Sequence, residues 1–355
     1  MKKARVVVGL SGGIDSSVAA LLLLEKGYEV IGVTMSIWDG EYRPTGKHAC
    51  YGPDEEEEIR EAGKVAAILG IPHYVYNCSA EYKSSVLEYF RSEYLAGRTP
   101  NPCVQCNKLI KFGLLPESVR KEGISFDFFA TGHYARVEEN HTTKRFFLKK
   151  GLDTKKDQSY FLYRLTQEQL STLLLPLGEY SKKEIMAKGR KTGIMIHEYE
   201  ESQDFYSGDY KEILDVREMP GDIINSSGKV LGHHKGIWNY TIGQRKGIGI
   251  AFHEPLYVVA LQRETNRVVV GTRSEIVQSE FKVRDLNWIS ESGLIEDMKV
   301  SVKIRSAQDE KEAMISPLGT QEVKVTYLCP DDAVTPGQSA VFYQGDVVVG
   351  GGIIQ

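Results

Sequence analysis

The first hydrophobic run of the chain reads Val6-Val7-Val8-Gly9-Leu10-Ser11-Gly12-Gly13-Ile14-Asp15-Ser16-Ser17. It continues into Val18-Ala19-Ala20-Leu21-Leu22-Leu23-Leu24, and this order indicates a buried strand, a glycine-rich turn and a helix. Loop amides, the hydroxyls of Ser11, Ser16 and Ser17, and the helix N-terminus are all suited to hold an oxyanion. The stretch therefore predicts a phosphate-binding loop rather than an ordinary turn.

This loop differs from a Walker A loop, which needs Gly-Lys-Ser/Thr to hold the β- and γ-phosphates. No lysine occurs between Gly9 and Ser17. The Ser-Gly-Gly-Ile-Asp-Ser spelling instead resembles the PP-loop of the ATP pyrophosphatases, which grip the leaving pyrophosphate and adenylate a substrate oxygen. That resemblance implies that Asp15 helps to place Mg²⁺ between phosphates as the α–β bond breaks. It implies ATP contacts from Gly9, Leu10, Ser11, Gly12, Gly13, Ile14, Asp15 and Ser16.

Length and composition indicate what class of protein carries this loop. A chain of 355 residues predicts two or three domains. With no run of about eighteen apolar residues we expect no transmembrane helix, and the first apolar run breaks too early for a signal peptide, so we expect a cytoplasmic protein. Five cysteines do not make a disulfide framework. The net charge of −4 argues against indiscriminate nucleic-acid binding, but not against a local basic face.

The first half of the chain alternates strand and helix patterns. Strands are expected over 28–35, 71–77 and 126–130, with helices over about 54–69 and 81–96 between them. This alternation predicts an α/β fold with a doubly wound parallel sheet, in which ligands bind outside the carboxyl ends of the strands. Met35 would then pack on adenine, and Gly132 would let the backbone approach the nucleotide. The acidic run 54–58 reads as a solvated helix start, and His133 as either a structural residue or a catalyst.

A second chemical stretch reads Asn101-Pro102-Cys103-Val104-Gln105-Cys106-Asn107-Lys108. Cysteines at a helix N-terminus, with Lys108 and Lys111 nearby, should have lowered pKa values. A redox dithiol, half of a metal site and a nucleophile all fit C-x-x-C. A zinc site usually needs a second ligand pair, and Cys50, Cys78 and Cys329 stand alone, so nucleophilic chemistry is favoured.

The pattern changes to short strands after about residue 205. Residues 206–280 predict a small β-rich domain with a basic, partly aromatic cluster that suits an RNA backbone, an ordinary solvated surface being the alternative. The cluster consists of His233, His234, Lys235, Trp238, Tyr240, Arg245 and Lys246. Residues 281–355 predict a small antiparallel β-barrel. The expected domains are therefore 1–205, 206–280 and 281–355.

Five blocks occur in one order along nearly the whole chain: residues 9–17, 101–112, 130–134, 156–162 and 243–247. Together they resemble the tRNA-specific 2-thiouridylases (MnmA/TrmU). The resemblance implies an ATP-dependent tRNA sulfurtransferase that adenylates the C2 oxygen of the wobble uridine, U34. A cysteine-borne sulfur then attacks C2. The implied partners are tRNA and a sulfur-donor protein, either a persulfide carrier or a cysteine desulfurase, with no membrane partner.

The resemblance also assigns residues. Cys106 matches the catalytic cysteine of the family, and Cys103 falls where members carry aspartate or cysteine. The implied tRNA contacts are Asn101, Pro102 and Cys103 around an extruded base, the loop Lys156, Asp157 and Gln158, and Arg305 and Ser306 in the barrel.

One departure concerns the second catalytic cysteine, which receives the persulfide in the family. The matching segment here reads Glu201-Ser202-Gln203-Asp204-Phe205-Tyr206-Ser207, with Tyr206 in its place. Either Cys103 becomes the partner of Cys106, or an iron–sulfur cluster on Cys50, Cys103 and Cys106 holds sulfide, or the chain is a non-catalytic tRNA-binding paralogue. A PP-loop amide ligase of the NAD-synthetase or argininosuccinate-synthase kind would share only the loop, without needing Cys106 or an RNA-facing domain.

Overall fold

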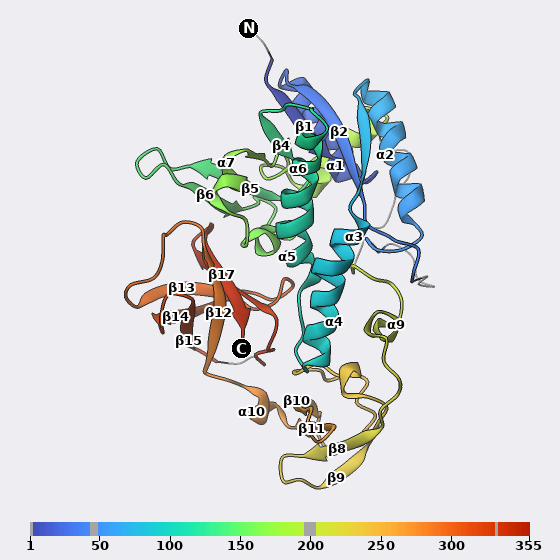
Figure 1. Ribbon diagram of the computed structural model, residues 1–355. Coiled ribbons are helices and arrows are strands. Elements are labelled where there is room, and N and C mark those ends of the chain that lie inside the picture. The colour runs from blue at the N-terminus through green and yellow to red at the C-terminus, as the bar shows by residue number, and fades with distance from the viewer. Residues whose placement is uncertain (1–2, 43–48, 195–203, 331–332) are drawn as a thin grey trace. The chain divides into compact units, whose positions relative to one another are not determined.

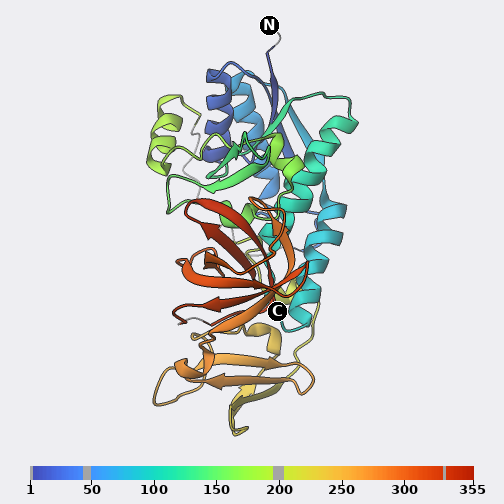
Figure 2. The same ribbon diagram turned by 90° about the vertical axis from the view of Figure 1, so that its left-hand side faces the viewer.

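The computed structural model describes residues 3–42, 49–194, 204–330 and 333–355. The chain forms two compact units (Figures 1 and 2). Unit 1 comprises Met1–Leu87, Pro102–Tyr210 and Asp346–Val348, and unit 2 comprises Glu88–Asn101, Lys211–Gly345 and Val349–Gln355.

Unit 1 is built on a five-stranded sheet of order β3-β2-β1-β4-β7. Every neighbouring pair is parallel, as the alternating pattern predicted. Val6, Val7 and Val8 are fully buried at its centre, which explains the unbroken β-branched run. The strands are β1 (Arg5–Gly9), β2 (Glu29–Ser36), β3 (His73–Asn77), β4 (Phe128–Ala130) and β7 (Leu173–Leu174).

Helices cover both faces of this sheet, so the doubly wound α/β fold is confirmed. On one face, α1 (Ile14–Glu25) and α2 (Glu55–Leu69) pack against Val6 and Val8. On the other, Phe129, in register with Val7, meets Phe112 edge to face. Further helices of unit 1 are α3 (Ser79–Tyr82), α5 (Pro102–Cys106), α6 (Leu115–Lys121), α7 (Gln167–Ser171), α8 (Lys182–Lys191) and the 3₁₀ turn η3 (Ser159–Leu162).

Two expected helices contain π-helical segments. The helix expected over 81–96 is divided into α3, the π-helical η1 (Lys83–Leu87) and α4 (Glu88–Leu95). The helix after the C-x-x-C pair is α5 followed by the π-helical η2 (Asn107–Leu114). Such segments are rare and often accompany functional sites.

Unit 2 contains a four-stranded sheet and a β-barrel. The sheet has the order β10-β11-β8-β9, made of β8 (Gly221–Asn225), β9 (Val230–His234), β10 (Tyr257–Gln262) and β11 (Arg267–Gly271). The barrel strands are β12 (Glu280–Trp288), β13 (Met298–Lys303), β14 (Lys311–Pro317), β15 (Glu322–Tyr327), β16 (Ser339–Gln344) and β17 (Val347–Ile354). Pairing of β12 with β17 closes it, and the predicted antiparallel barrel is confirmed.

Short elements complete the chain. A hairpin of β5 (Ala135–Glu139) and β6 (Phe146–Lys150) belongs to unit 1, where Lys149 pairs with Val347. The others are α9 (Tyr210–Leu214), α10 (Arg273–Ile276) and the 3₁₀ turn η4 (Ile237–Asn239).

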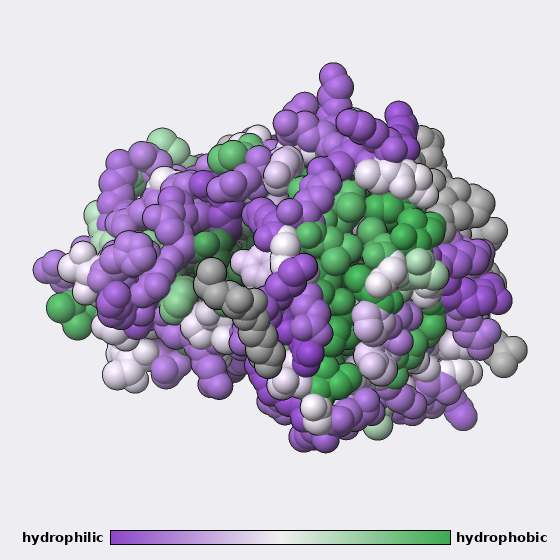
Figure 3. Space-filling view, turned by 90° about the horizontal axis from the view of Figure 1, so that it is seen from above, coloured by the Kyte–Doolittle hydropathy of each residue, from purple (hydrophilic) through white to green (hydrophobic). Residues whose placement is uncertain are grey.

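One face of the molecule shows a hydrophobic area bordered by hydrophilic residues (Figure 3). Among the described helices, none has the length and apolar character needed to cross a membrane.

The acidic start of α2 is only partly the solvated feature that the sequence predicted. Glu55 is 7% exposed, and its carboxylate accepts hydrogen bonds from the Ser36 hydroxyl at 2.7 Å and from the amides of Ile37 at 2.6 Å and Trp38 at 3.0 Å. Burial raises the pKa of Glu55, and these hydrogen bonds act in the opposite direction. Glu55 therefore fixes the chain as it leaves β2, whereas Glu57 is exposed as expected.

Glu55→Ala should lower the free energy of unfolding by roughly 1–3 kcal/mol, because the buried Ile37 amide loses its acceptor. Glu57→Ala, in the same turn of α2, is the matched control and should stay within about 0.5 kcal/mol of the parent protein. Urea denaturation of both variants checks this. Equal stabilities of the two variants would contradict the anchoring role of Glu55.

Candidate functional site

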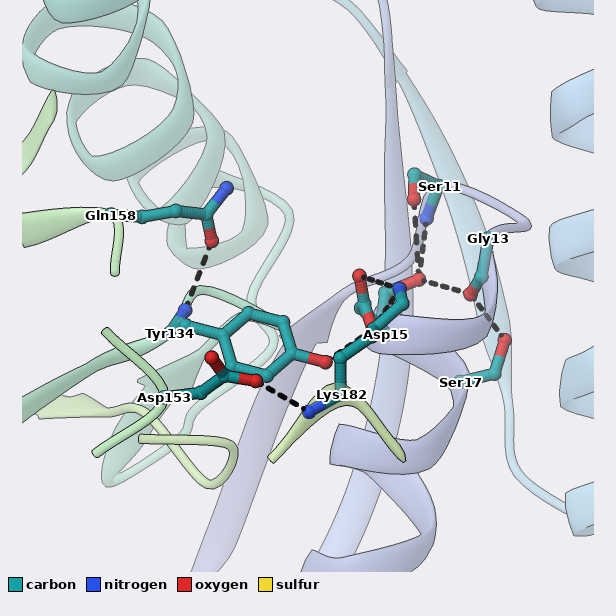
Figure 4. A network of polar contacts seen from close by, with 9 residues as sticks. Ser11, Gly13, Asp15, Ser17, Tyr134, Asp153, Gln158 and Lys182 are labelled. Atoms are coloured by element: carbon teal, nitrogen blue, oxygen red, sulfur yellow. Dashed lines mark hydrogen bonds and ion pairs between the residues drawn. The ribbon is translucent and has the colours of Figure 1, made fainter. Parts of the chain in front are cut away.

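The predicted phosphate loop joins the carboxyl end of β1 to α1 and is closed by its own hydroxyl groups (Figure 4). The Ser16 hydroxyl donates to the Gly13 carbonyl at 3.1 Å and accepts from the Ser11 amide at 3.1 Å. The Ser17 hydroxyl donates to the same Gly13 carbonyl at 2.8 Å. Gly12 has a φ of +77°, and a Cβ placed there would lie 2.7 Å from the Glu58 carbonyl oxygen. The loop thus needs both its serines and its glycine for its shape.

Gly132, which is expected to let the backbone approach the nucleotide, lies against this loop. A Cβ on Gly132 would lie 2.7 Å from both the Asp15 carbonyl carbon and the Ser16 amide nitrogen, so a larger residue would collide with backbone. Met35 is half-buried near the carboxyl end of β2, two residues beyond the Gly9–Val33 pair. The structure therefore brings the candidate ATP-binding residues together at one edge of the sheet.

The side chain of Asp15 lies at the centre of a polar network (Figure 4). The Lys182 ammonium donates to both of its oxygens at 2.8 Å, and the Tyr134 hydroxyl donates to one of them at 2.7 Å. The backbone amide of Lys182 donates to Asp153 at 3.0 Å. Asp15 and Lys182 are both largely buried, with side chains 25% and 19% exposed.

Sequence reasoning missed Lys182, Tyr134 and Asp153. The capping box formed by Ser181 and Glu184 could have located the start of α8, but it does not single out the lysine beside it. The consequence is chemical: a loop that has no lysine of its own receives a cation from a helix far along the chain.

Asp15 is a single carboxylate, which suits Mg²⁺ only when phosphate oxygens and water supply the other ligands. Among the residues that the structure describes, no group of three or more histidine, cysteine, aspartate or glutamate side chains is arranged to hold a metal ion. Within residues 9–17, Asp15 is the acidic residue that could ligate a cation bound together with a nucleotide, and its carboxylate is held by Lys182 and Tyr134.

Cys103 and Cys106 lie on α5, and the predicted lowering of their pKa values is wrong. Burial raises the pKa of Cys103 to about 12 and that of Cys106 to about 11. The positive charge of Lys111 lowers both values, but by less than burial raises them. Both groups are therefore neutral thiols at pH 7. The sequence-based prediction failed because the local sequence shows the lysine but not the apolar surroundings of the thiols.

His133 hydrogen-bonds through Nδ1 to the Thr131 hydroxyl at 2.8 Å, and its ring lies 5.6 Å from that of Phe112. Burial, with a smaller effect of Lys111, lowers its pKa well below the usual value. A neutral imidazole with these partners favours the structural interpretation over the catalytic one.

The loop expected to contact tRNA is held by two of its own side chains. Asp157 accepts from the amides of Gly151 and Ser159 at 3.0 and 3.1 Å. Gln158 accepts from the Tyr134 amide at 2.9 Å. Asp157 and Gln158 therefore shape the loop that presents Lys156, and Gln158 also supports the residue that contacts Asp15.

In unit 2, Arg305 plays a similar supporting part. Its guanidinium donates to the Thr335 hydroxyl at 2.6 Å and to the Ile242 carbonyl at 3.3 Å. It thereby anchors the loop that carries the exposed Arg245 and Lys246, while Ser306 is itself exposed. In the predicted basic cluster, His234 is buried, 3% exposed, and hydrogen-bonds to the Asn266 carbonyl. The prediction that His234 belongs to an exposed basic surface is therefore wrong.

Tyr206 is buried, 2% exposed, and its ring centroid lies 6.4 Å from that of Tyr51. Residues 201–203 of the same segment lie outside the described residues.

All five cysteines are described, and none of them forms a disulfide. Cys50 is exposed, Cys78 is buried, and Cys103 and Cys106 are half-buried.

Three family models match the chain in succession. A tRNA methyl transferase HUP domain matches residues 4–206, a tRNA methyl transferase PRC-barrel domain matches 211–272, and an aminomethyltransferase beta-barrel domain matches 278–354.

Curated relatives match over the full length. The tRNA-specific 2-thiouridylase MnmA of Endomicrobium trichonymphae is 48% identical, covering 99% of this chain and 98% of its own. MnmA 1 of Caldanaerobacter subterraneus subsp. tengcongensis is 50% identical with the same coverage. MnmA of Acetivibrio thermocellus is 45% identical over 100% of both chains. The chain therefore belongs to the tRNA-specific 2-thiouridylase family.

Proposed function

We propose that this protein is an ATP-dependent tRNA sulfurtransferase that converts the wobble uridine, U34, to 2-thiouridine through an adenylated uridine and a cysteine-borne sulfur. The observation that carries the proposal is the Asp15–Lys182 ion pair at the PP-loop, within the same unit as the thiols of Cys103 and Cys106. An adenylation site without thiols would serve many reactions. Combined with relatives named as 2-thiouridylases, the pair of features favours thiolation.

The first step activates the base. The loop amides and the Lys182 ammonium would hold the β- and γ-phosphates while the C2 oxygen of uridine attacks the α-phosphorus and pyrophosphate leaves. Mg²⁺, bound through Asp15 and phosphate oxygens, would neutralise charge on the departing pyrophosphate. Binding of ATP would also separate Lys182 from Asp15, because phosphate offers the ammonium a more highly charged partner.

The second step delivers sulfur. A cysteine-borne sulfur forms a bond to C2, the C2–O bond breaks, and AMP leaves with the oxygen. The raised pKa of Cys106, about 11, means that little thiolate is present before a substrate or sulfur donor changes its surroundings. Premature attack by an unloaded thiol is thereby suppressed.

The third component is RNA. Exposed cations at Arg245 and Lys246 and the half-buried Lys156 would contact the phosphate backbone, and Ser306 would add a hydroxyl contact. Asn101, Pro102 and Cys103 would surround the base once it leaves its stack. A tRNA substrate and a persulfide donor would support a cytoplasmic location for this activity.

One observation favours a second candidate, a tRNA-binding paralogue without sulfur transfer: a tyrosine, which cannot carry sulfane sulfur, occupies the place of the second cysteine. The amide-ligase alternative has no comparable support, because the family match extends beyond the loop through all three regions. The iron–sulfur alternative needs Cys50, Cys103 and Cys106 to share one site, and among the described residues no group of three or more such side chains is arranged to hold a metal ion.

Measuring 2-thiouridine in tRNA from cells with and without the gene tests the proposal. The modified nucleoside should disappear from digested tRNA when the gene is deleted and return when it is restored. Unchanged 2-thiouridine after deletion, in cells with no second copy, would support the non-catalytic paralogue.

Lys182→Gln should slow tRNA-dependent pyrophosphate release by about 10²–10³-fold, the scale expected when one preorganised charged donor is lost from an active site. Lys183→Gln changes an exposed neighbour on the same helix and is the matched control. Quench-flow measurement of pyrophosphate from ATP checks both variants. If Lys182→Gln released pyrophosphate as fast as Lys183→Gln, the assignment of Lys182 would be wrong.

Alkylation of Cys106 by iodoacetamide should accelerate by about tenfold per pH unit between pH 7 and 9, because a thiol with a raised pKa gains thiolate throughout this range. Lys111→Gln should slow the reaction further by removing the charge that favours the thiolate, and Lys108→Gln is its control. Peptide mass spectrometry follows the reaction at each cysteine. A rate that levels off below pH 9 would contradict the neutral thiol.

A further inference from the structure

Two loops of unit 1 that are far apart in sequence run side by side, and one of them carries Cys50. Ala49 forms a parallel bridge with Asp204, and the Tyr51 amide donates to the Phe205 carbonyl at 2.9 Å. Cys50 therefore lies between two residues that are attached to the segment ending in Tyr206.

The side chains of this pairing separate into buried rings and one exposed thiol. Ala49 and Tyr51, on either side of Cys50, are 5% and 1% exposed, whereas Cys50 is exposed. The Tyr51 ring stacks on that of Tyr82 with centroids 5.5 Å apart and also contacts Tyr206. Tyr206 thus serves as part of an aromatic core, and the adjacent loop presents a cysteine.

The three thiols share one electrostatic neighbourhood. After burial, a negative charge on Cys50 is the next cause of the raised pKa of Cys103, and it raises that of Cys106 as well. The phenol of Tyr82 has its pKa raised first by burial and then by charges on Cys106, Cys50 and Cys103. The contacts agree with this: Tyr51, next to Cys50, stacks on Tyr82 of α3, and η1, which follows Tyr82, packs against α5.

We propose that Cys50 is the sulfur-carrying cysteine of this enzyme, taking the role that other family members give to a cysteine at the position of Tyr206. The inference rests on the proposed thiolation activity and names a residue for its sulfur step. Accessibility supports the choice, since a donor protein must reach the acceptor thiol. Of the other cysteines, Cys78 is buried, and Cys329, also exposed, belongs to unit 2.

The chemistry balances with a persulfide donor and a dithiol reductant. The Cys50 thiolate attacks the outer sulfur of the donor persulfide, a Cys50 S–S bond forms, and the donor thiolate leaves. The terminal sulfur then attacks C2 of the adenylated uridine, and AMP leaves. Finally the Cys106 thiolate attacks Sγ of Cys50, forming a Cys50–Cys106 disulfide and releasing the thiouridine sulfur with its electron pair. The dithiol reduces this disulfide and is itself oxidised.

The test uses the full-length protein with Cys329→Ser as the parent, so that the other exposed thiol gives no background. Protein loaded with ³⁵S-labelled glutathione persulfide is desalted and mixed with ATP and unmodified tRNA for a single turnover. Cys50→Ser should reduce ³⁵S transfer to tRNA by about 10²-fold or more, as loss of a covalent nucleophile does. It should still release pyrophosphate, which shows that the variant is folded.

A second measurement is independent of any variant at Cys50. After one turnover without reductant, non-reducing peptide mass spectrometry of the Cys329→Ser parent should find a Cys50–Cys106 disulfide. A Cys103–Cys106 disulfide, or parent-level ³⁵S transfer by Cys50→Ser, would overturn the role of Cys50 alone. Failure of the parent to release pyrophosphate with tRNA would contradict the proposed function, and this inference with it.

Discussion

The ion pair between Asp15 and Lys182 positions, before ATP binds, the two groups on which the proposed nucleotide site depends. It joins the loop after β1 to the start of α8, 167 residues further along the chain, and Tyr134 ties the region after β4 to the same carboxylate. Because both partners are largely buried, solvent screens the pair less than an exposed one. In the proposed phosphate site, Lys182 would supply the cation that the loop itself lacks, and Gly132 allows the close approach of backbone at this loop.

The same unit holds the proposed nucleophiles, Cys103 and Cys106, as protonated thiols. Burial outweighs the charge of Lys111, so Cys103 and Cys106 are protonated in the free protein. The proposed order of adenylation before sulfur transfer agrees with this, because an activated uridine is exposed to sulfur only after ATP has been consumed. An exposed Cys50 beside half-buried partners would separate the place where sulfur is received from the place where it is used.

Much of the fold could be predicted because its signals are local. The buried strand at Val6–Val8, the glycine turn and the alternation in the barrel each reflect neighbouring residues, and the position of Gly132 follows from strand order. Lys182 could not be predicted, since its role arises from contact between distant segments. The predicted direction of the thiol pKa shifts is wrong because burial comes from elements remote in sequence. The anchoring role of Glu55 could not be predicted, because its sequence neighbours indicate only an ordinary acidic helix start. Cys50 was identified as a candidate ligand, but its pairing beside Tyr206 is a tertiary feature.

If uridine is adenylated, its C2 oxygen leaves as part of AMP. The measurement uses tRNA that carries ¹⁸O at this oxygen of U34, incubated with the enzyme, ATP and a persulfide donor. Mass spectrometry should find the heavy oxygen in the AMP phosphate, in an amount equal to the 2-thiouridine formed. Thiolated tRNA accompanied by AMP that contains oxygen from water alone would contradict the adenylated intermediate.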